Sequence, residues 1–298
     1  MRAFGWFFGA VLLALLIGAM VAYPAYLAVA PIGGWAFHRV AGRIAMLILA
    51  AELVWVCRHL RIETKRDFGF GLPWRRFVAQ SALWGAVGTA TAAAGAAFLL
   101  GAHLRVPDPG LVLSARTLLH LLLTGASSGI AVALIEETVI RGAMHTAIER
   151  ESGSWSAALL TAPLYAVLHF FAKASIPPDR LAWRSGFDLL AYSFAPLSHP
   201  SAVLDAFLAW LAVGLVLSLT RVLCGNIAVA IGLHAGWVLV LRMLQVGTVR
   251  GASPAYSAWV GRFDGLLGYW LLPWAGAIGL GLWLTRHRWV AAARGTAR

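Results

Sequence analysis

The sequence contains little charge, little cysteine and no long polar segment. Only 12% of its 298 residues are charged, whereas about a quarter of the residues in a soluble globular protein are. The two cysteines, Cys57 and Cys224, are too few for a disulfide-stapled scaffold or a cysteine-based metal motif. The longest polar connections, residues 58–76 and 173–200, are too short for a soluble domain. These shortages exclude most classes of soluble protein.

Apolar sequence is abundant and comes in blocks long enough to span a membrane. Hydrophobic residues make up 60% of the chain, and the mean hydropathy is +0.78. A helix of about 20 apolar residues crosses a hydrocarbon core of about 30 Å, and the alternating pattern of a barrel strand is missing. We therefore predict an all-α fold, a polytopic transmembrane helix bundle that forms a single integral membrane domain over residues 1–298. We expect about eight spanning helices, at residues 4–29, 40–57, 77–100, 118–140, 154–172, 202–219, 227–244 and 266–284.

The chain is strongly basic, with a formal net charge of +12 and a sequence pI near 11.0. A nucleic-acid-binding protein has similar values, but the distribution of charge favours a membrane protein. Cationic residues gather after the second and the last predicted spans, at residues 58–76 and 286–298. This follows the positive-inside rule, although Lys173, Arg180 and Arg184 fall on the opposite side. We predict no nucleic-acid partner, a prokaryotic inner membrane, and two cytoplasmic termini; the oligomeric state stays open.

Two carboxylates and a guanidinium interrupt the end of one apolar run, at Glu136, Glu137 and Arg141. Charges inside a membrane are costly and are usually kept for function. On a helix Glu137 can pair with Arg141, four residues later. Glu136 then faces elsewhere, where a desolvated carboxylate is suited to accept and return protons. The alternative is that both acids cap or solvate a helix end.

Two histidines, His169 and His234, are each surrounded by apolar residues within a predicted span. A single buried histidine is more often a hydrogen-bonded core residue than a catalyst. Two of them on separate helices, together with the glutamate pair, indicate a shared polar pocket. The sequence therefore predicts one polar site inside the helix bundle.

These residues resemble the motifs of a known family, the CAAX-protease and bacteriocin-processing (CPBP) membrane proteins, also called the abortive-infection family. That family carries Glu-Glu-x-x-x-Arg, Phe-x-x-x-His and His-x-x-x-Asn or Asp on different transmembrane helices. Here the first motif is intact, and the second has Tyr165 before His169, which keeps an aromatic ring. The third has His234 but ends in Val238, which cannot donate a hydrogen bond. The resemblance covers residues 118–244, the expected catalytic core.

The resemblance implies an intramembrane endopeptidase that hydrolyses a peptide bond in a membrane-proximal or lipidated protein segment. By this likeness Glu136 and His169 would activate a water molecule, and His234 would help to stabilise the oxyanion. Glu137 and Arg141 would shape the site. A general base and a polar donor in a dry cavity serve proton transfer and the developing charge, respectively. No covalent acyl-enzyme and no cofactor are expected.

Asn226 and Trp237 lie near these motifs, and each can be interpreted in two ways. Asn226 either caps the helix that follows it or supplies the polar group missing from the third motif; we favour the cap. Trp237 lies one turn after a motif histidine, and we assign it to helix packing rather than to the pocket wall. Trp270 and Trp274 begin the last predicted span and are interpreted as interfacial anchors.

Two other functions remain open on sequence grounds. His169, His234 and Glu136 would make a plausible zinc ligand set, which makes a zinc-dependent membrane protease the mechanistic alternative; no His-Glu-x-x-His motif is present. A non-catalytic membrane immunity or partner-binding protein is the other, and Val238 favours it. For an enzyme, the expected partners are the lipid bilayer and a membrane-associated protein or peptide substrate.

Overall fold

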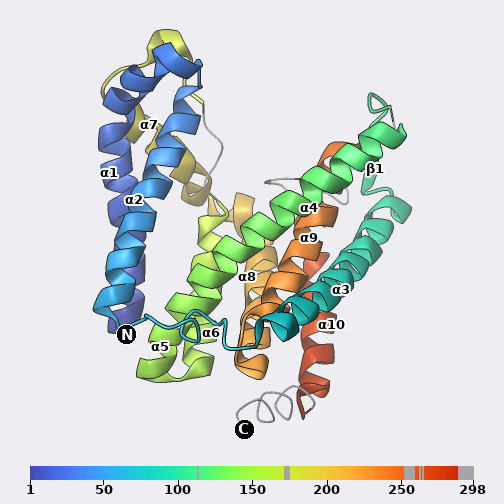
Figure 1. The fold of residues 1–298 in the computed structure, drawn as a ribbon. Helices are drawn as coiled ribbons and strands as arrows, with labels where there is room; N and C mark the ends of the chain where they lie inside the picture. The colour runs from blue at the N-terminus through green and yellow to red at the C-terminus, as the bar shows by residue number, and fades with distance from the viewer. Residues whose placement is uncertain (113, 171–174, 252–258, 262, 264, 288–298) are drawn as a thin grey trace. The chain divides into compact units, whose positions relative to one another are not determined.

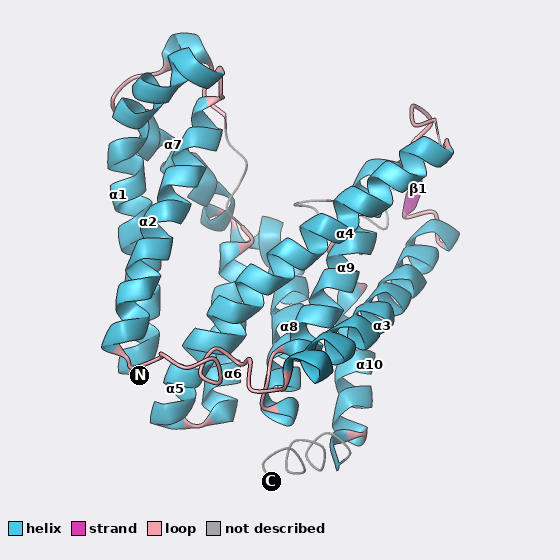
Figure 2. Ribbon diagram, viewed as in Figure 1, coloured by secondary structure: helices cyan, strands magenta, loops and turns pink. Residues whose placement is uncertain are grey.

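The computed structural model describes residues 1–112, 114–170, 175–251, 259–261, 263 and 265–287. Lys173 and residues 288–298, which entered the charge argument, lie outside the described residues. Helices dominate the described chain, and its strands are two short segments that pair with each other (Figure 2). The predicted all-α, polytopic helical bundle is confirmed.

The helices follow the apolar runs, because a helix satisfies its own backbone hydrogen bonds where no water is available. Helix α4 starts where the Ser114 side chain accepts a hydrogen bond from Thr117 N, and α1 ends at Gly34, whose φ of 59° suits glycine. The long apolar helices are α1 (Arg2–Gly33), α2 (Phe37–His59), α3 (Trp74–Gly101), α4 (Ala115–Glu137), α8 (Pro200–Cys224) and α9 (Ala228–Gly247). The shorter helices are α5 (His145–Ser152), α6 (Ser154–Leu168), α7 (Ser185–Phe194) and α10 (Leu271–Leu284).

Each predicted span falls on a helix, but two of the helices are shorter than predicted. Six helical stretches in the described chain are long and apolar enough to cross a membrane. Helices α6 and α10 have 15 and 14 residues, so at 1.5 Å per residue they extend about 22 and 21 Å, less than the core thickness of about 30 Å. Phe171 and Ala172, at the predicted end of the fifth span, lie outside the described residues.

Contacts divide the chain into two compact units, and the first contains residues 1–63 and 167–203. Within it α1 packs along α2 and also against α7 (Figure 1). The close approach of α1 and α2 occurs at Gly18, where a Cβ would lie 2.9 Å from the Ala45 Cβ. His169 belongs to this unit.

The second unit contains residues 64–166 and 204–298. Its central helix, α9, packs against both α3 and α4 (Figure 1). Glycines allow this closeness: a Cβ at Gly88 of α3 would lie 2.5 Å from Leu233 O, and one at Gly129 of α4 would lie 2.5 Å from Ala235 O. Strands β1 (Arg105–Pro107) and β2 (Thr248–Arg250) pair antiparallel after α3 and α9. The expectation of a single domain over residues 1–298 stays a prediction.

Candidate active site

The first motif lies where an α-helix changes into a π-helix. Helix α4 ends at Glu137, residues Thr138–Met144 are π-helical, and α5 follows directly. Such segments are rare and often occur at functional sites. Arg141 Nη1 lies 3.1 Å from Glu137 Oε1, and neither side chain has any exposed surface. The predicted Glu137–Arg141 pair is therefore present, and it is fully buried.

His234, on α9, lies between the two glutamates. Its Nδ1 is 2.8 Å from Glu137 Oε1, and its Nε2 is 3.9 Å from Glu136 Oε2. A carboxylate only accepts hydrogen bonds, so His234 Nδ1 carries the hydrogen that it donates to Glu137. The opposite ring nitrogen, Nε2, is then the atom directed at Glu136, where it accepts a proton when the ring is neutral and donates when the ring is charged.

Glu136 is the more accessible of the two glutamates. Its side chain is 31% exposed, yet its Oε2 is buried and has no hydrogen-bond partner among the described residues. The distance of 3.9 Å between Glu136 Oε2 and His234 Nε2 is too long for a direct hydrogen bond. A water molecule can bridge two polar atoms at such a distance. Glu136 and His234 can therefore act as a base and an acid on the same bound group.

Tyr165, on α6, lies between Arg141 and His234. The Arg141 guanidinium lies 4.4 Å from the centre of the Tyr165 ring, a favourable contact when desolvated. The same ring meets the His234 ring edge-on, with centroids 6.2 Å apart. From α8, Gly214 O accepts a hydrogen bond from Arg141 Nη2 at 3.1 Å. Tyr165 therefore contacts both Arg141 and His234.

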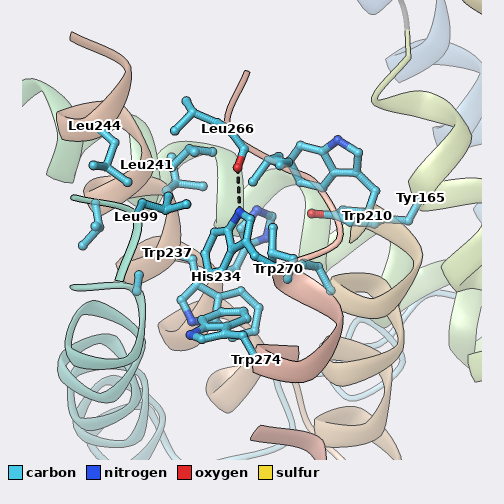
Figure 3. A pocket seen from close by; sticks show the side chains of 16 residues that line it. Leu99, Tyr165, Trp210, His234, Trp237, Leu241, Leu244, Leu266, Trp270 and Trp274 are labelled. Atoms are coloured by element: carbon cyan, nitrogen blue, oxygen red, sulfur yellow. Dashed lines mark hydrogen bonds between the residues drawn. The ribbon is translucent and has the colours of Figure 1, made fainter. Parts of the chain in front are cut away.

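An apolar cavity of about 80 Å³ borders His234 and Tyr165. Figure 3 shows Tyr165 and Trp210 on one side, leucines that include Leu241 and Leu244 on the other, and His234 near the middle. Val238, in the third motif, also lines this cavity. The valine therefore extends the apolar wall where the family has an amide or acid.

Three tryptophans of the cavity wall are held in place by their indole N–H groups. Trp270 donates to Leu266 O at 2.7 Å, the bond drawn in Figure 3, and Trp274 donates to Thr91 O at 3.0 Å. Trp237 donates to Thr91 Oγ1 at 3.1 Å. Trp270 and Trp274 therefore line the cavity and are not interfacial anchors, whereas Trp237 packs in the core, as predicted, and lines the cavity as well. Their ring faces line the cavity because the N–H groups are satisfied elsewhere.

Two predicted residues lie outside this cluster or outside this unit. Asn226 uses its side chain on the local backbone: its Oδ1 accepts from Ala228 N at 3.0 Å, and its Nδ2 donates to Cys224 O at 2.9 Å. These bonds organise the start of α9, about 12 Å along the helix from His234. His169 lies in the turn after α6, half-buried, and belongs to the first unit. Its shared role with Glu136 stays a prediction.

Comparison with known families identifies the segment that carries this cluster. Residues 117–240 match the family described as Type II CAAX prenyl endopeptidase Rce1-like. This segment is an Rce1-like domain of the CPBP family. The match and the long apolar helices together make the chain an integral membrane protein. No curated protein and no solved structure matches the chain.

The Rce1-like domain contains all seven predicted site residues, and its bounds lie close to those of the predicted core, residues 118–244. At the level of the family it supports a membrane-embedded peptidase that acts on a membrane-associated peptide. The wall tryptophans Trp270 and Trp274 lie after the matched segment, so the start of α10 and the residues just before it complete the cavity from outside the domain.

Sequence reasoning missed two residues of α8 that contact Arg141, namely Gly214 and Arg221. Arg221 carried the same signal as Glu136, a charge in an otherwise apolar run. It was overlooked because the predicted span ended at residue 219. Gly214 acts through its carbonyl group, so its residue type gave no signal.

The described chain shows no candidate metal cluster. Within it, no three side chains of histidine, cysteine, aspartate or glutamate lie close enough to hold a metal ion. Metal independence remains a prediction, which a chelation experiment addresses below.

Proposed function

We propose that this chain is an intramembrane endopeptidase that hydrolyses a peptide bond in a membrane-proximal or lipidated protein segment. The observation that carries the proposal is the position of His234, which lines an apolar cavity, is held by Glu137 and is directed at Glu136. A base and a polar donor beside a water-poor cavity serve the two needs of amide hydrolysis, proton transfer and stabilisation of negative charge. The Rce1-like domain supports the same class of reaction.

In the proposed mechanism, Glu136 takes a proton from a water molecule as the water oxygen bonds to the scissile carbonyl carbon. His234 donates a hydrogen bond through Nε2–H to the resulting oxyanion, while Glu137 keeps the Nδ1–H and fixes the ring. Glu136 then returns the proton to the nitrogen that leaves as the carbon–nitrogen bond breaks. By family resemblance His169 contributes a second contact to the water. The protein itself forms no covalent bond to the substrate.

We propose that the cavity binds an aliphatic side chain next to the scissile bond. Its volume of about 80 Å³ is about half that of an engineered apolar cavity that holds benzene, about 150 Å³. A branched aliphatic side chain fits that space, whereas a complete prenyl chain extends beyond it. Candidate substrates are a lipidated or prenylated carboxyl-terminal segment, a peptide leader and a carboxyl-terminal sorting helix.

The charge pattern supports an orientation in which both termini are cytoplasmic, in a prokaryotic inner membrane. The partners would then be the bilayer and a protein or peptide substrate that reaches the site from the membrane. An orientation test with residue-specific labelling from each side of sealed vesicles checks this placement.

Purified protein in liposomes tests the proposed activity directly. The substrates are three peptides that represent the three candidate classes, and mass spectrometry of the products locates any cleavage. Glu136→Gln should abolish cleavage, because a neutral amide cannot accept the proton. Glu52→Gln, the same change in α2 of the first unit, is the matched control and should cleave like wild type. Equal cleavage by wild type and Glu136→Gln would contradict the mechanism.

A chelator followed by zinc add-back separates metal-independent hydrolysis from the zinc alternative. We expect the same rate before and after chelation. A loss of activity that zinc restores would establish the metalloprotease instead. If none of the three peptides is cleaved but one binds at equal affinity to wild type and Glu136→Gln, the partner-binding alternative is favoured.

A further inference from the structure

Arg221 is a buried cation on α8 that the proposed mechanism does not use. Its exposed fraction is 7%. Its Nε donates to Arg141 O at 3.1 Å, and its Nη2 donates to Thr146 Oγ1 at 3.2 Å. The same Nη2 lies 3.5 Å from Glu149 Oε2. One guanidinium therefore joins α8 to the π-helical segment and to two positions on α5.

Helix α8 contacts both the main chain and the guanidinium of Arg141. Arg221 binds the main-chain carbonyl of Arg141, and Gly214 O accepts from the guanidinium of Arg141 at 3.1 Å. Gly214 and Arg221 are seven residues apart, which places them on the same face of α8, two turns from each other. The position of Arg141 along α8 is therefore fixed by its backbone and by its side chain.

Arg141 is connected to His234 through a single oxygen atom of Glu137. Arg141 Nη1 binds Glu137 Oε1, and the same oxygen accepts from His234 Nδ1. The carbonyl that Arg221 binds lies inside the π-helical segment, Thr138–Met144, where the backbone hydrogen bonds depart from the α-helical pattern. Removing the Arg221 guanidinium would leave the buried Arg141 carbonyl without this donor. If the π-helical segment then rewound into an α-helix, Arg141 would turn away from α8.

We propose that Arg221 is a positioning residue, which holds the π-helical segment so that Arg141, Glu137 and His234 keep their alignment. Its effect on catalysis rests on the proposed endopeptidase function, but its effect on the orientation of His234 does not. A misplacement of about 1 Å of a catalytic group can lower a rate about 10²-fold. Arg221 should therefore influence kcat while leaving KM unchanged, since it is not among the residues that line the cavity.

The test compares Arg221→Met and Arg221→Lys with a matched control, Arg242→Met. Arg242 is an exposed arginine on α9 whose guanidinium binds Gln245 Oε1 at 3.3 Å. The first measurement is ¹⁵N NMR of histidine-labelled protein in detergent, with the His234 signals assigned by their loss in His234→Gln. The second is kcat and KM for the cleavage found above. Thermal unfolding of each variant checks that it is folded.

We expect Arg221→Met to shift the Nδ1 and Nε2 signals of His234 and to lower kcat about 10²-fold with KM within about twofold. Arg221→Lys keeps a cation that can reach one of the three contacts, so it should show a smaller shift and a smaller loss, and it serves as the folded variant if Arg221→Met does not fold. The control should match wild type in both measurements.

Unchanged His234 signals in a folded Arg221 variant would overturn the proposal, whatever the value of kcat. Shifted signals in a protein that cleaves none of the peptides would support the positioning role and refute the endopeptidase function. The two proposals therefore fail separately.

Discussion

The replacement of Glu137 by alanine tests whether one buried carboxylate organises the site. Glu137 Oε1 accepts hydrogen bonds from Arg141 Nη1 and His234 Nδ1, at 3.1 and 2.8 Å. Hydrogen bonds to charged groups contribute about 1.5–3 kcal/mol each, so losing both costs about 3–6 kcal/mol. Removing one partner of a buried ion pair costs about 3–5 kcal/mol. Both routes predict a loss of about 4 kcal/mol in the free energy of unfolding.

The activity of Glu137→Ala should fall more than its stability suggests. Without the carboxylate, His234 Nδ1–H loses its acceptor, the charge of the doubly protonated ring is no longer balanced, and the ring is no longer fixed. A misplacement of about 1 Å of a catalytic group can lower a rate about 10²-fold, and we expect a loss of at least about 10²-fold here. Glu137→Gln, whose amide oxygen can occupy the Oε1 position and keep both contacts, should lose less.

The assay for these variants measures kcat per folded molecule together with unfolding in denaturant. The expected order of kcat is wild type, then Glu137→Gln, then Glu137→Ala. A Glu137→Ala protein that keeps kcat within twofold of wild type, with an unfolding free energy within about 0.5 kcal/mol, would refute the claim that Glu137 orients His234.

Three further predictions concern neighbouring positions. Gly142→Ala should destabilise the protein by about 1–3 kcal/mol in a denaturant titration, since its Cβ would lie 2.5 Å from Phe68 O; an unchanged titration midpoint would contradict this close approach. Tyr165→Leu should lower stability by about 2 kcal/mol or more, because the cation–π contact with Arg141 is lost, whereas Tyr165→Phe should keep that contact and unfold near the wild-type midpoint. Val238→Asn should raise kcat in the cleavage assay by up to about 10²-fold, since one oxyanion donor is worth about 10²–10³-fold; an unchanged or lower kcat would indicate that another group already donates.

The order of the helices was predictable because apolar length alone determines which segments can cross a bilayer. Helix α7 (Ser185–Phe194) was not expected, since a helix of ten residues produces no apolar run of spanning length. The shortness of α6 and α10 was also missed, because the apolar runs continue beyond the helical residues. Hydropathy indicates which residues avoid water, but it does not indicate at which residue a helix begins or ends.

The site was predictable to the extent that its contacts are local in sequence. The Glu137–Arg141 pair follows from a spacing of four residues. The position of His234 between two glutamates depends on how α4 packs against α9, and no local pattern records that. Trp270 and Trp274, at the start of α10, were misassigned for the same reason: residues at a helix end look alike in the sequence whether they face lipid headgroups or a cavity.

The central claim is that Glu136 catalyses the cleavage of a peptide bond in a membrane-associated protein. Its most direct test is mass spectrometry of membrane-protein termini from cells that produce wild type, Glu136→Gln or the control Glu52→Gln at equal abundance. We predict that one defined set of new termini is present with wild type and the control and missing with Glu136→Gln. Identical termini in all three, with the protein inserted and folded, would contradict the proposed function.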